Sequence, residues 1–319
     1  MSTPTTTTST ATSSPLKRLL IDHPLVAYFV IAFAGAWLTV LPLMLSQTGL
    51  GVFSFTFPTL PFLMLGALAG PTLAAFVVTA AQSGKAGVWQ LLRRYVLWRV
   101  GIQWYLLVLI VQPLVILLGL SVWLGAAPLF ALVQQWPLLF TFYLPLVLTF
   151  LFIGGPLGEE PGWRGFALPR LQQQYGAVLG SLILGTLWAI WHLPGFFGGW
   201  LGPFTFPVFI GEIIAAIAVS IIVTWVYNNT QGSILIAILF HAASNAAVSL
   251  ATHLVPPGVP RSGLVPFILA SNGVGVTAYG LCALLILIFT KGRLSYRPDR
   301  EVQPAEASLT GEIESIGQE

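Results

Sequence analysis

Five side chains in the second half of the chain could take part in one hydrolytic reaction. They are Glu159 and Glu160, His192, and the pair His241 and Asn245. Carboxylates and imidazoles activate water, and imidazole and carboxamide groups donate hydrogen bonds to a developing oxyanion. All five lie in or beside strongly apolar runs, where ionisable groups are costly and tend to be functional. The pattern therefore predicts a catalytic or ion-binding site inside a largely apolar protein.

The first motif is the segment Gly158–Arg164, which reads GEEPGWR and follows an apolar run. We expect a helix to begin here, with Pro161 in its first turn, where a missing N–H is harmless. Glu160 and Arg164 then stand four residues apart and pair on one helix face. Glu159 is left free to act as the general base that activates water. The simpler alternative is a cluster of interfacial charges at the end of a span.

The second and third motifs each place two special residues four apart. In the second, Trp188 precedes His192 on one helix face, and Pro194 ends or kinks the helix just beyond. In the third, His241 and Asn245 share a face in another apolar run. A lone histidine on an apolar face is usually a packing residue, so the argument rests on the three motifs together.

Glu212 is the remaining acid of the apolar region, since only three acids lie between Pro24 and Phe289. Two interpretations stay open: Glu212 lines a cavity near the histidines, or it sits near the outer interface. His23 and His253 flank apolar runs and are expected to be interfacial.

The composition indicates what must position these residues. The chain is 56% hydrophobic and only 7% charged, which leaves too few polar groups to cover a water-facing surface. Apolar runs of about 20 residues predict an all-α polytopic membrane protein with about eight transmembrane helices. The predicted spans are Pro24–Leu45, Pro58–Ala81, Gly101–Leu124, Trp136–Leu157, Ala177–Leu193, Pro207–Tyr227, Ser233–Leu250 and Val265–Phe289.

The basic residues predict the orientation of these spans. With a cytoplasmic N-terminus, twelve of the thirteen Lys and Arg residues fall on the cytoplasmic side, and only Arg261 falls outside. Both termini are then cytoplasmic, and the basic run from Lys85 to Arg99 faces anionic lipid rather than nucleic acid. We expect a disordered tail over residues 1–22, a transmembrane domain over 23–290 with a motif-bearing core at about 136–250, and a disordered cytoplasmic tail over 291–319.

The ordered set of EExxxR, an aromatic-xxx-His and His-xxx-Asn resembles the CPBP family, which contains the CAAX proteases and the bacteriocin-processing Abi proteins. The resemblance covers roughly Trp136 to Leu250, and differs in having Trp188 where the family pattern usually has Phe. It implies an intramembrane endopeptidase. Glu159 would be the general base and would hold a water together with His192.

The resemblance also assigns the remaining motif residues. Glu160 and Arg164 would orient the site, and His241 and Asn245 would stabilise the oxyanion. Families of this type are commonly labelled metalloproteases, so the cofactor has two interpretations. Either Glu159, His192 and His241 bind zinc, or the site is a metal-free glutamate protease.

Other functions are less consistent with the pattern. An aspartyl dyad is excluded because both aspartates lie outside the spans, and neither GxSG nor HExxH occurs. A membrane transporter that uses Glu and His for ion or proton coupling, or a non-catalytic immunity protein, remains an alternative. The expected partners are membrane lipids and a peptide or protein substrate, either lipidated or not, and no nucleic acid. The tails carry no retention signal, which favours a prokaryotic cell membrane.

Overall fold

The computed structural model describes residues 15–153, 155–255 and 272–298, and within these ranges every regular element is a helix. The predicted disorder of the extreme tails and the outer position of Arg261 lie outside the described residues. The π-helical turns are η1 (Leu68–Thr72), η2 (Leu107–Val111), η3 (Leu139–Tyr143) and η4 (Trp163–Ala167). The α-helices are α1 (Pro15–Asp22), α2 (Pro24–Leu45), α3 (Thr59–Ala67), α4 (Leu73–Tyr95), α5 (Ile102–Leu106), α6 (Gln112–Leu124), α7 (Ala127–Gln134), α8 (Leu144–Ile153), α9 (Pro156–Gly162), α10 (Leu168–Trp191), α11 (Pro194–Phe197), α12 (Phe206–Asn229), α13 (Ile234–His253) and α15 (Gly273–Phe289).

The prediction of an all-α, multi-pass membrane protein is confirmed. In the described part of the chain, six helical segments are long and apolar enough to cross a bilayer. A seventh is added if α7 and the η3–α8 segment, bent by 85°, count as one span. The apolar helix α15 has 17 residues and corresponds to the end of the eighth predicted span, whose predicted start at Val265 is not described. Each predicted span therefore has a helical counterpart.

Two long helices, α4 and α10, bend at a glycine. Gly84 in α4 has φ +57°, and Gly176 in α10 has φ +79°. Such angles are easily adopted only by glycine, so each helix bends sharply there. The bends lie close to the predicted span limits at Ala81 and Ala177. The basic end of α4 and the first turns of α10 are thus separate from the apolar spans.

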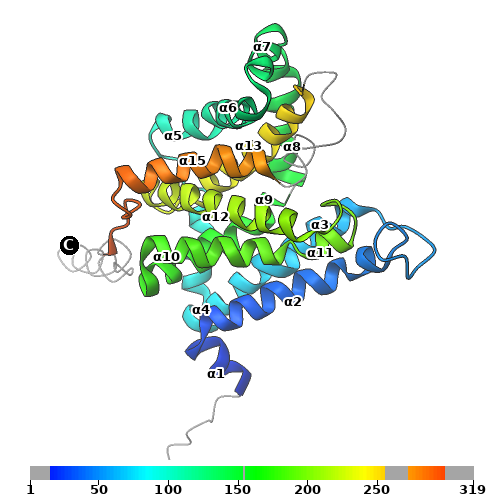
Figure 1. The fold of residues 1–319 in the computed structure, drawn as a ribbon. Coiled ribbons are helices and arrows are strands. Elements are labelled where there is room, and N and C mark those ends of the chain that lie inside the picture. The colour runs from blue at the N-terminus through cyan, green and yellow to red at the C-terminus, as the bar shows by residue number, and fades with distance from the viewer. Residues whose placement is uncertain (1–14, 154, 256–271, 299–319) are drawn as a thin grey trace, which may run out of the picture.

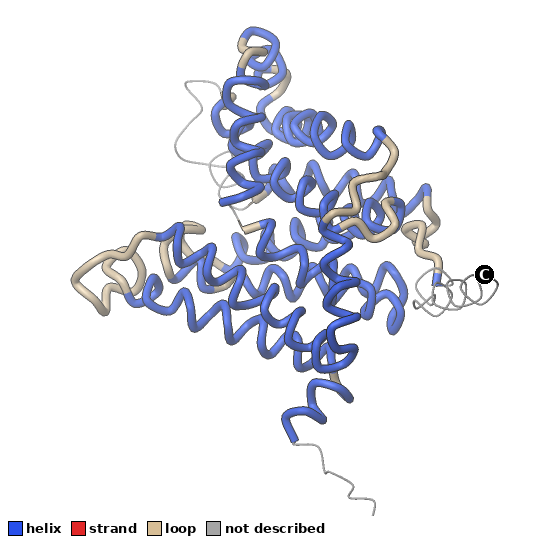
Figure 2. The backbone as a smooth tube through the Cα atoms, turned by 180° about the vertical axis from the view of Figure 1, so that it is seen from behind, coloured by secondary structure: helices blue, strands red, loops and turns tan. Residues whose placement is uncertain are grey.

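The helices pack around two hydrophobic cores. One core is built largely by α6, α8, α12, α13 and α15, and the other by α2, α4, η4 and α10. Helix α12 lies between α10 and α15, as the stacked ribbons in Figure 1 show. The loops gather at the ends of the bundle (Figure 2). Many large apolar side chains on the outer surface are exposed, as expected for helices solvated by lipid.

The segments beside the tails are more ordered than the sequence suggested. Residues 15–22, assigned by sequence to a disordered tail, form α1. At the other end, the Leu294 side chain is fully buried, and its carbonyl accepts a hydrogen bond of 2.9 Å from Asn228 Nδ2. Both segments are fixed by contact with the bundle.

Candidate active site

The adjacent glutamates lie on α9, a short buried helix between α8 and α10. Gly155, with φ +92°, turns the chain, and Pro156 begins the helix. The expected helix start at Pro161 is therefore wrong, because Pro161 lies near the C-terminal end of α9. Proline lacks the N–H that an α-helix would use, and the π-helical turn η4 follows directly.

Glycines allow α9 to pack closely against α3 and η1. A Cβ atom at Gly158 would lie 2.9 Å from Ala67 Cβ, and one at Gly162 would lie 2.5 Å from the Pro71 carbonyl oxygen. Thr72 Oγ1 donates a 2.6 Å hydrogen bond to the Gly158 carbonyl across the same contact. Close helix approach through small residues is the usual packing mode in membranes. These contacts fix the position of the two glutamates between the glycines.

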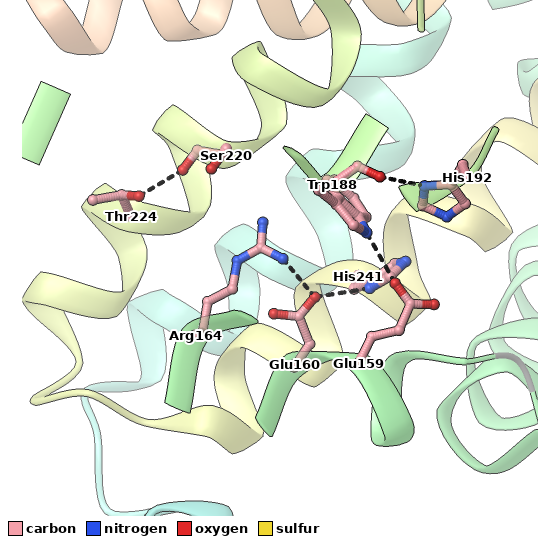
Figure 3. Close-up of polar contacts among 8 residues, drawn as sticks. All are labelled: Glu159, Glu160, Arg164, Trp188, His192, Ser220, Thr224 and His241. Carbon is pink, nitrogen blue, oxygen red and sulfur yellow. Dashed lines mark hydrogen bonds and ion pairs between the residues drawn. The ribbon is translucent and has the colours of Figure 1, made fainter. Parts of the chain in front are cut away.

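Glu160 is the centre of a buried charge cluster. Its Oε1 accepts a 2.9 Å hydrogen bond from Arg164 Nη1 and another of 2.9 Å from His241 Nδ1 (Figure 3). The i, i+4 pair predicted from the sequence is thus present, with both side chains about 1% exposed. A buried charge needs such compensation, because desolvation costs several kcal/mol per ion. Arg164 is inside the bundle and does not add to the cytoplasmic surface charge predicted above.

Glu159 points away from this ion pair and contacts Trp188 instead. Its Oε2 accepts a 2.9 Å hydrogen bond from the Trp188 indole Nε1. Its Oε1 lies 2.6 Å from the place where a Cβ of Gly155 would be. Glycine is therefore needed at position 155 for two reasons. Its φ angle is positive, and a side chain there would collide with the Glu159 carboxylate. Glu159 forms no ion pair with another described residue.

Trp188 contacts both motif histidines and the arginine. Its ring meets His241 at 5.3 Å and His192 at 5.5 Å between ring centroids, and the Arg164 guanidinium lies 5.0 Å from it. Figure 3 shows Arg164 on one side of the indole, with Glu159, His192 and His241 grouped on the other. The aromatic residue at this position therefore contacts Arg164 and both histidines and also donates a hydrogen bond to Glu159.

The hydrogen-bond partners define which ring nitrogens are free. His192 Nδ1 lies 2.9 Å from the Trp188 carbonyl oxygen, which can only accept. His241 Nδ1 faces the Glu160 carboxylate, which accepts when it is ionised beside Arg164. Each Nδ1 therefore carries a hydrogen, and each Nε2 is available for chemistry.

Two predicted residues are not joined to this group by a hydrogen bond in the described structure. Asn245 lies one turn beyond His241 on α13, on the predicted face, and is half-buried. Glu212 accepts a 2.9 Å hydrogen bond from Asn272 Nδ2, at the start of α15. This bond joins α12 to α15 and favours the interfacial interpretation of Glu212 over a place among the motif histidines.

The residues suggested as zinc ligands are Glu159, His192 and His241. Among the described residues, no three His, Cys, Asp or Glu side chains converge closely enough to hold a metal ion. One Glu159 carboxylate oxygen already accepts a hydrogen bond from Trp188. The arrangement as it stands does not fit the three-ligand site that the sequence suggested.

An aromatic layer behind the charge cluster was missed by the sequence analysis. Tyr28 of α2 stacks on Phe166 and meets Trp163 edge-on, and all three rings are at most 1% exposed. Among the described residues, the Tyr28 hydroxyl and Trp163 Nε1 have no hydrogen-bond partner, and neither do Glu160 Oε2 or two Arg164 nitrogens. Buried groups of this kind commonly bind internal water. The only available signal was Trp163 within the first motif.

Comparisons with known proteins match the part of the chain that carries this site. Residues 134–247 match the family described as type II CAAX prenyl endopeptidase Rce1-like. The chain is also similar to the protein named CAAX prenyl protease 2 of Methanococcus maripaludis, with 25% identity over 250 residues. The alignment covers 73% of this chain and 86% of that protein. The matched family segment contains all three motifs. Over these residues, the chain is therefore similar to the CAAX prenyl endopeptidases.

Proposed function

We propose that this protein is an intramembrane endopeptidase of the CAAX prenyl protease type, which hydrolyses a peptide bond with a water activated by Glu159. One observation carries the proposal. Glu159, His192 and His241 meet around a single tryptophan in a buried site, and both imidazole Nε2 atoms are unused. Buried ionisable groups with no evident structural need are expected at functional sites in membranes.

Water is activated in this proposal by two hydrogen-bond acceptors. One O–H of the water donates to the Glu159 carboxylate, and the other donates to His192 Nε2. A lone pair of the water oxygen is then directed to the carbonyl carbon of the substrate. As the C–O bond forms, Glu159 takes the proton. The indole of Trp188 holds the carboxylate in place through its 2.9 Å bond.

The negative charge that develops on the carbonyl oxygen is stabilised by α13. His241, with its Nδ1 hydrogen bonded to Glu160, donates from Nε2 when the ring carries a second proton. Asn245 donates from its carboxamide one turn away on the same helix face. The tetrahedral intermediate then collapses, the C–N bond breaks, and Glu159 returns its proton to the leaving amine. Atoms and charge balance without another reactant.

Glu160 and Arg164 position the site and do not touch the substrate. Glu160 Oε1 fixes the orientation of the His241 ring, and Arg164 compensates the charge of Glu160. The cation also lies over the Trp188 ring at 5.0 Å, which links the pair to the residue that holds Glu159.

The comparisons support a lipidated substrate. The similar archaeal protein is named a prenyl protease, and the matched family is described as prenyl endopeptidases. We propose a peptide or protein substrate with a lipidated cysteine near its C-terminus, which would reach the buried site from the bilayer. The archaeal relative also supports a prokaryotic cell membrane as the location.

The test is cleavage by the purified protein in nanodiscs. Farnesylated peptides and their unprenylated counterparts would be compared for wild type, Glu159→Gln and Glu212→Gln, each with and without a zinc chelator. We expect Glu159→Gln to lower the cleavage rate at least about a hundredfold, because it removes the general base. Glu212→Gln is the matched control, since it also neutralises an acid of the apolar region.

The outcomes separate the competing functions. An equal loss of cleavage in Glu159→Gln and Glu212→Gln, or unchanged cleavage by Glu159→Gln, would contradict the role of Glu159 as the general base. Inhibition by the chelator, reversed by added zinc, would require a metal in place of the metal-free mechanism. If no peptide is cleaved and Glu159 controls ion flux in proteoliposomes instead, the transporter interpretation takes its place.

A further inference from the structure

A second polar feature lies outside the candidate active site. A cavity of about 910 Å³ is lined by residues of α1, α2, α4 and α10. The helix α1 and the neighbouring ends of α4 and α10 lie at the lower left of Figure 1. None of the motif residues of the active site lines this cavity. By the predicted orientation it lies on the cytoplasmic side, beside the bends at Gly84 and Gly176.

Two arginines, Arg94 and Arg170, line the cavity without an ion-pair partner among the described residues. Arg170 donates to the Phe166 carbonyl at 3.1 Å and to Gln82 Oε1 at 3.0 Å. Arg94 donates to the Tyr227 hydroxyl at 2.9 Å. These partners are neutral, and neither arginine forms an ion pair with another described residue.

The arrangement of the arginines is unfavourable without an anion. Both are half-buried, and their charges act on each other. Asp22 is the one acid among the cavity-lining residues, at the end of α1. Two neighbouring cations held by neutral partners form a site for a phosphate group, which arginine binds well.

The rest of the cavity lining has polar and apolar parts. Gln173 and Gln174 follow Arg170 on α10 and add amide donors. The apolar residues include Leu25, Val26 and Ile183, which belong to spanning helices. A ligand that fits both parts has an anionic head and a hydrocarbon tail.

We propose that this cavity binds an anionic phospholipid, with the headgroup phosphate between Arg94 and Arg170 and an acyl chain along α2 and α10. Basic pockets between transmembrane helices at the cytoplasmic surface are suited to such headgroups. The site is distinct from the peptidase site and does not depend on the proposed function.

The test measures lipid binding directly. Purified protein in detergent would be titrated with phosphatidylglycerol, phosphatidylcholine or inorganic phosphate, with bound lipid counted by native mass spectrometry. We expect phosphatidylglycerol to bind wild type at least about tenfold more tightly than the Arg94→Gln/Arg170→Gln variant. The matched control is Arg93→Gln, which removes an exposed neighbouring charge and should bind like wild type.

A second variant tests the site without removing the arginines, whose loss could disturb folding. Gln174→Glu places a negative charge in the lining and leaves both arginines intact, and we expect it to weaken phosphatidylglycerol binding several-fold. Equal binding of phosphatidylglycerol by all variants, or equal binding of phosphatidylcholine, would overturn the proposal. Occupation by inorganic phosphate alone would also overturn it, as would displacement of the lipid by a peptide carboxylate, which would assign the cavity to substrate.

Discussion

Helix α13 takes part in two buried polar clusters that differ in charge. The first joins His241 to Glu160 and Arg164 and contains ionisable groups. The second, one turn away, is neutral. In it Tyr279 donates to Gln112 Oε1 at 2.9 Å and also bonds Ser244.

The two clusters also differ in how completely their hydrogen bonds are made. In the neutral cluster, Gln112 Nε2 donates to the Phe240 carbonyl at 3.3 Å, so both ends of the amide have partners. In the charged cluster, Glu160 Oε2 and the Nε and Nη2 atoms of Arg164 have no partner in the part of the chain that the structure describes. A complete network favours a rigid structure, whereas free donors and acceptors leave room for water and reaction. The comparison predicts that the neutral cluster serves stability and the charged cluster serves catalysis.

Breaking the charge pair on one side should have the largest effect on stability. We expect Glu160→Gln to lower the free energy of unfolding by about 3–5 kcal/mol, because Arg164 stays buried without a counter-charge. Thermal unfolding in detergent measures this loss. The double variant Glu160→Gln/Arg164→Met should recover much of the stability without recovering cleavage. If the single and the double variant are equally unstable, the unpaired charge of Arg164 is not the cause of the lost stability.

Breaking the neutral cluster should have a smaller effect of a different kind. Tyr279→Phe removes one hydroxyl and leaves Gln112 Oε1 without its donor. We expect a loss of about 1–2 kcal/mol in stability and an unchanged cleavage rate below the unfolding temperature. Ser249→Ala is a suitable control, since its hydroxyl bonds only within its own helix, to the Asn245 carbonyl. A cleavage defect in Tyr279→Phe would join the two clusters into one functional unit.

The features that the sequence predicted depend on residues a few positions apart in the chain. The Glu160–Arg164 pair follows from an i, i+4 relation within continuous helical backbone, and so does the shared face of His241 and Asn245. The spans follow from apolar length alone. These features depend on residues that are near one another in the chain.

Contacts between distant segments explain what the sequence could not predict. His241 meets Glu160 across 81 positions, and Trp188 meets Glu159 across 29. Such contacts depend on how the helices cross. The crossing depends in turn on close contacts at glycines and on the bends in the long helices. The start of α9 was misplaced for a local reason: two prolines, Pro156 and Pro161, both suit a first turn.

The smallest expected effect concerns the residue that departs from the family pattern. Trp188→Phe keeps an aromatic ring between the histidines but removes the indole donor to Glu159. We expect cleavage to fall only a few-fold, equivalent to about 1 kcal/mol, because one hydrogen bond is lost and the carboxylate remains. Trp188→Ala removes the ring as well, so the difference between the two variants measures packing separately from the hydrogen bond. A loss in Trp188→Phe as large as that in Glu159→Gln would show that the indole N–H takes part in water activation itself. Trp188 would then be a fifth catalytic side chain beside Glu159, His192, His241 and Asn245.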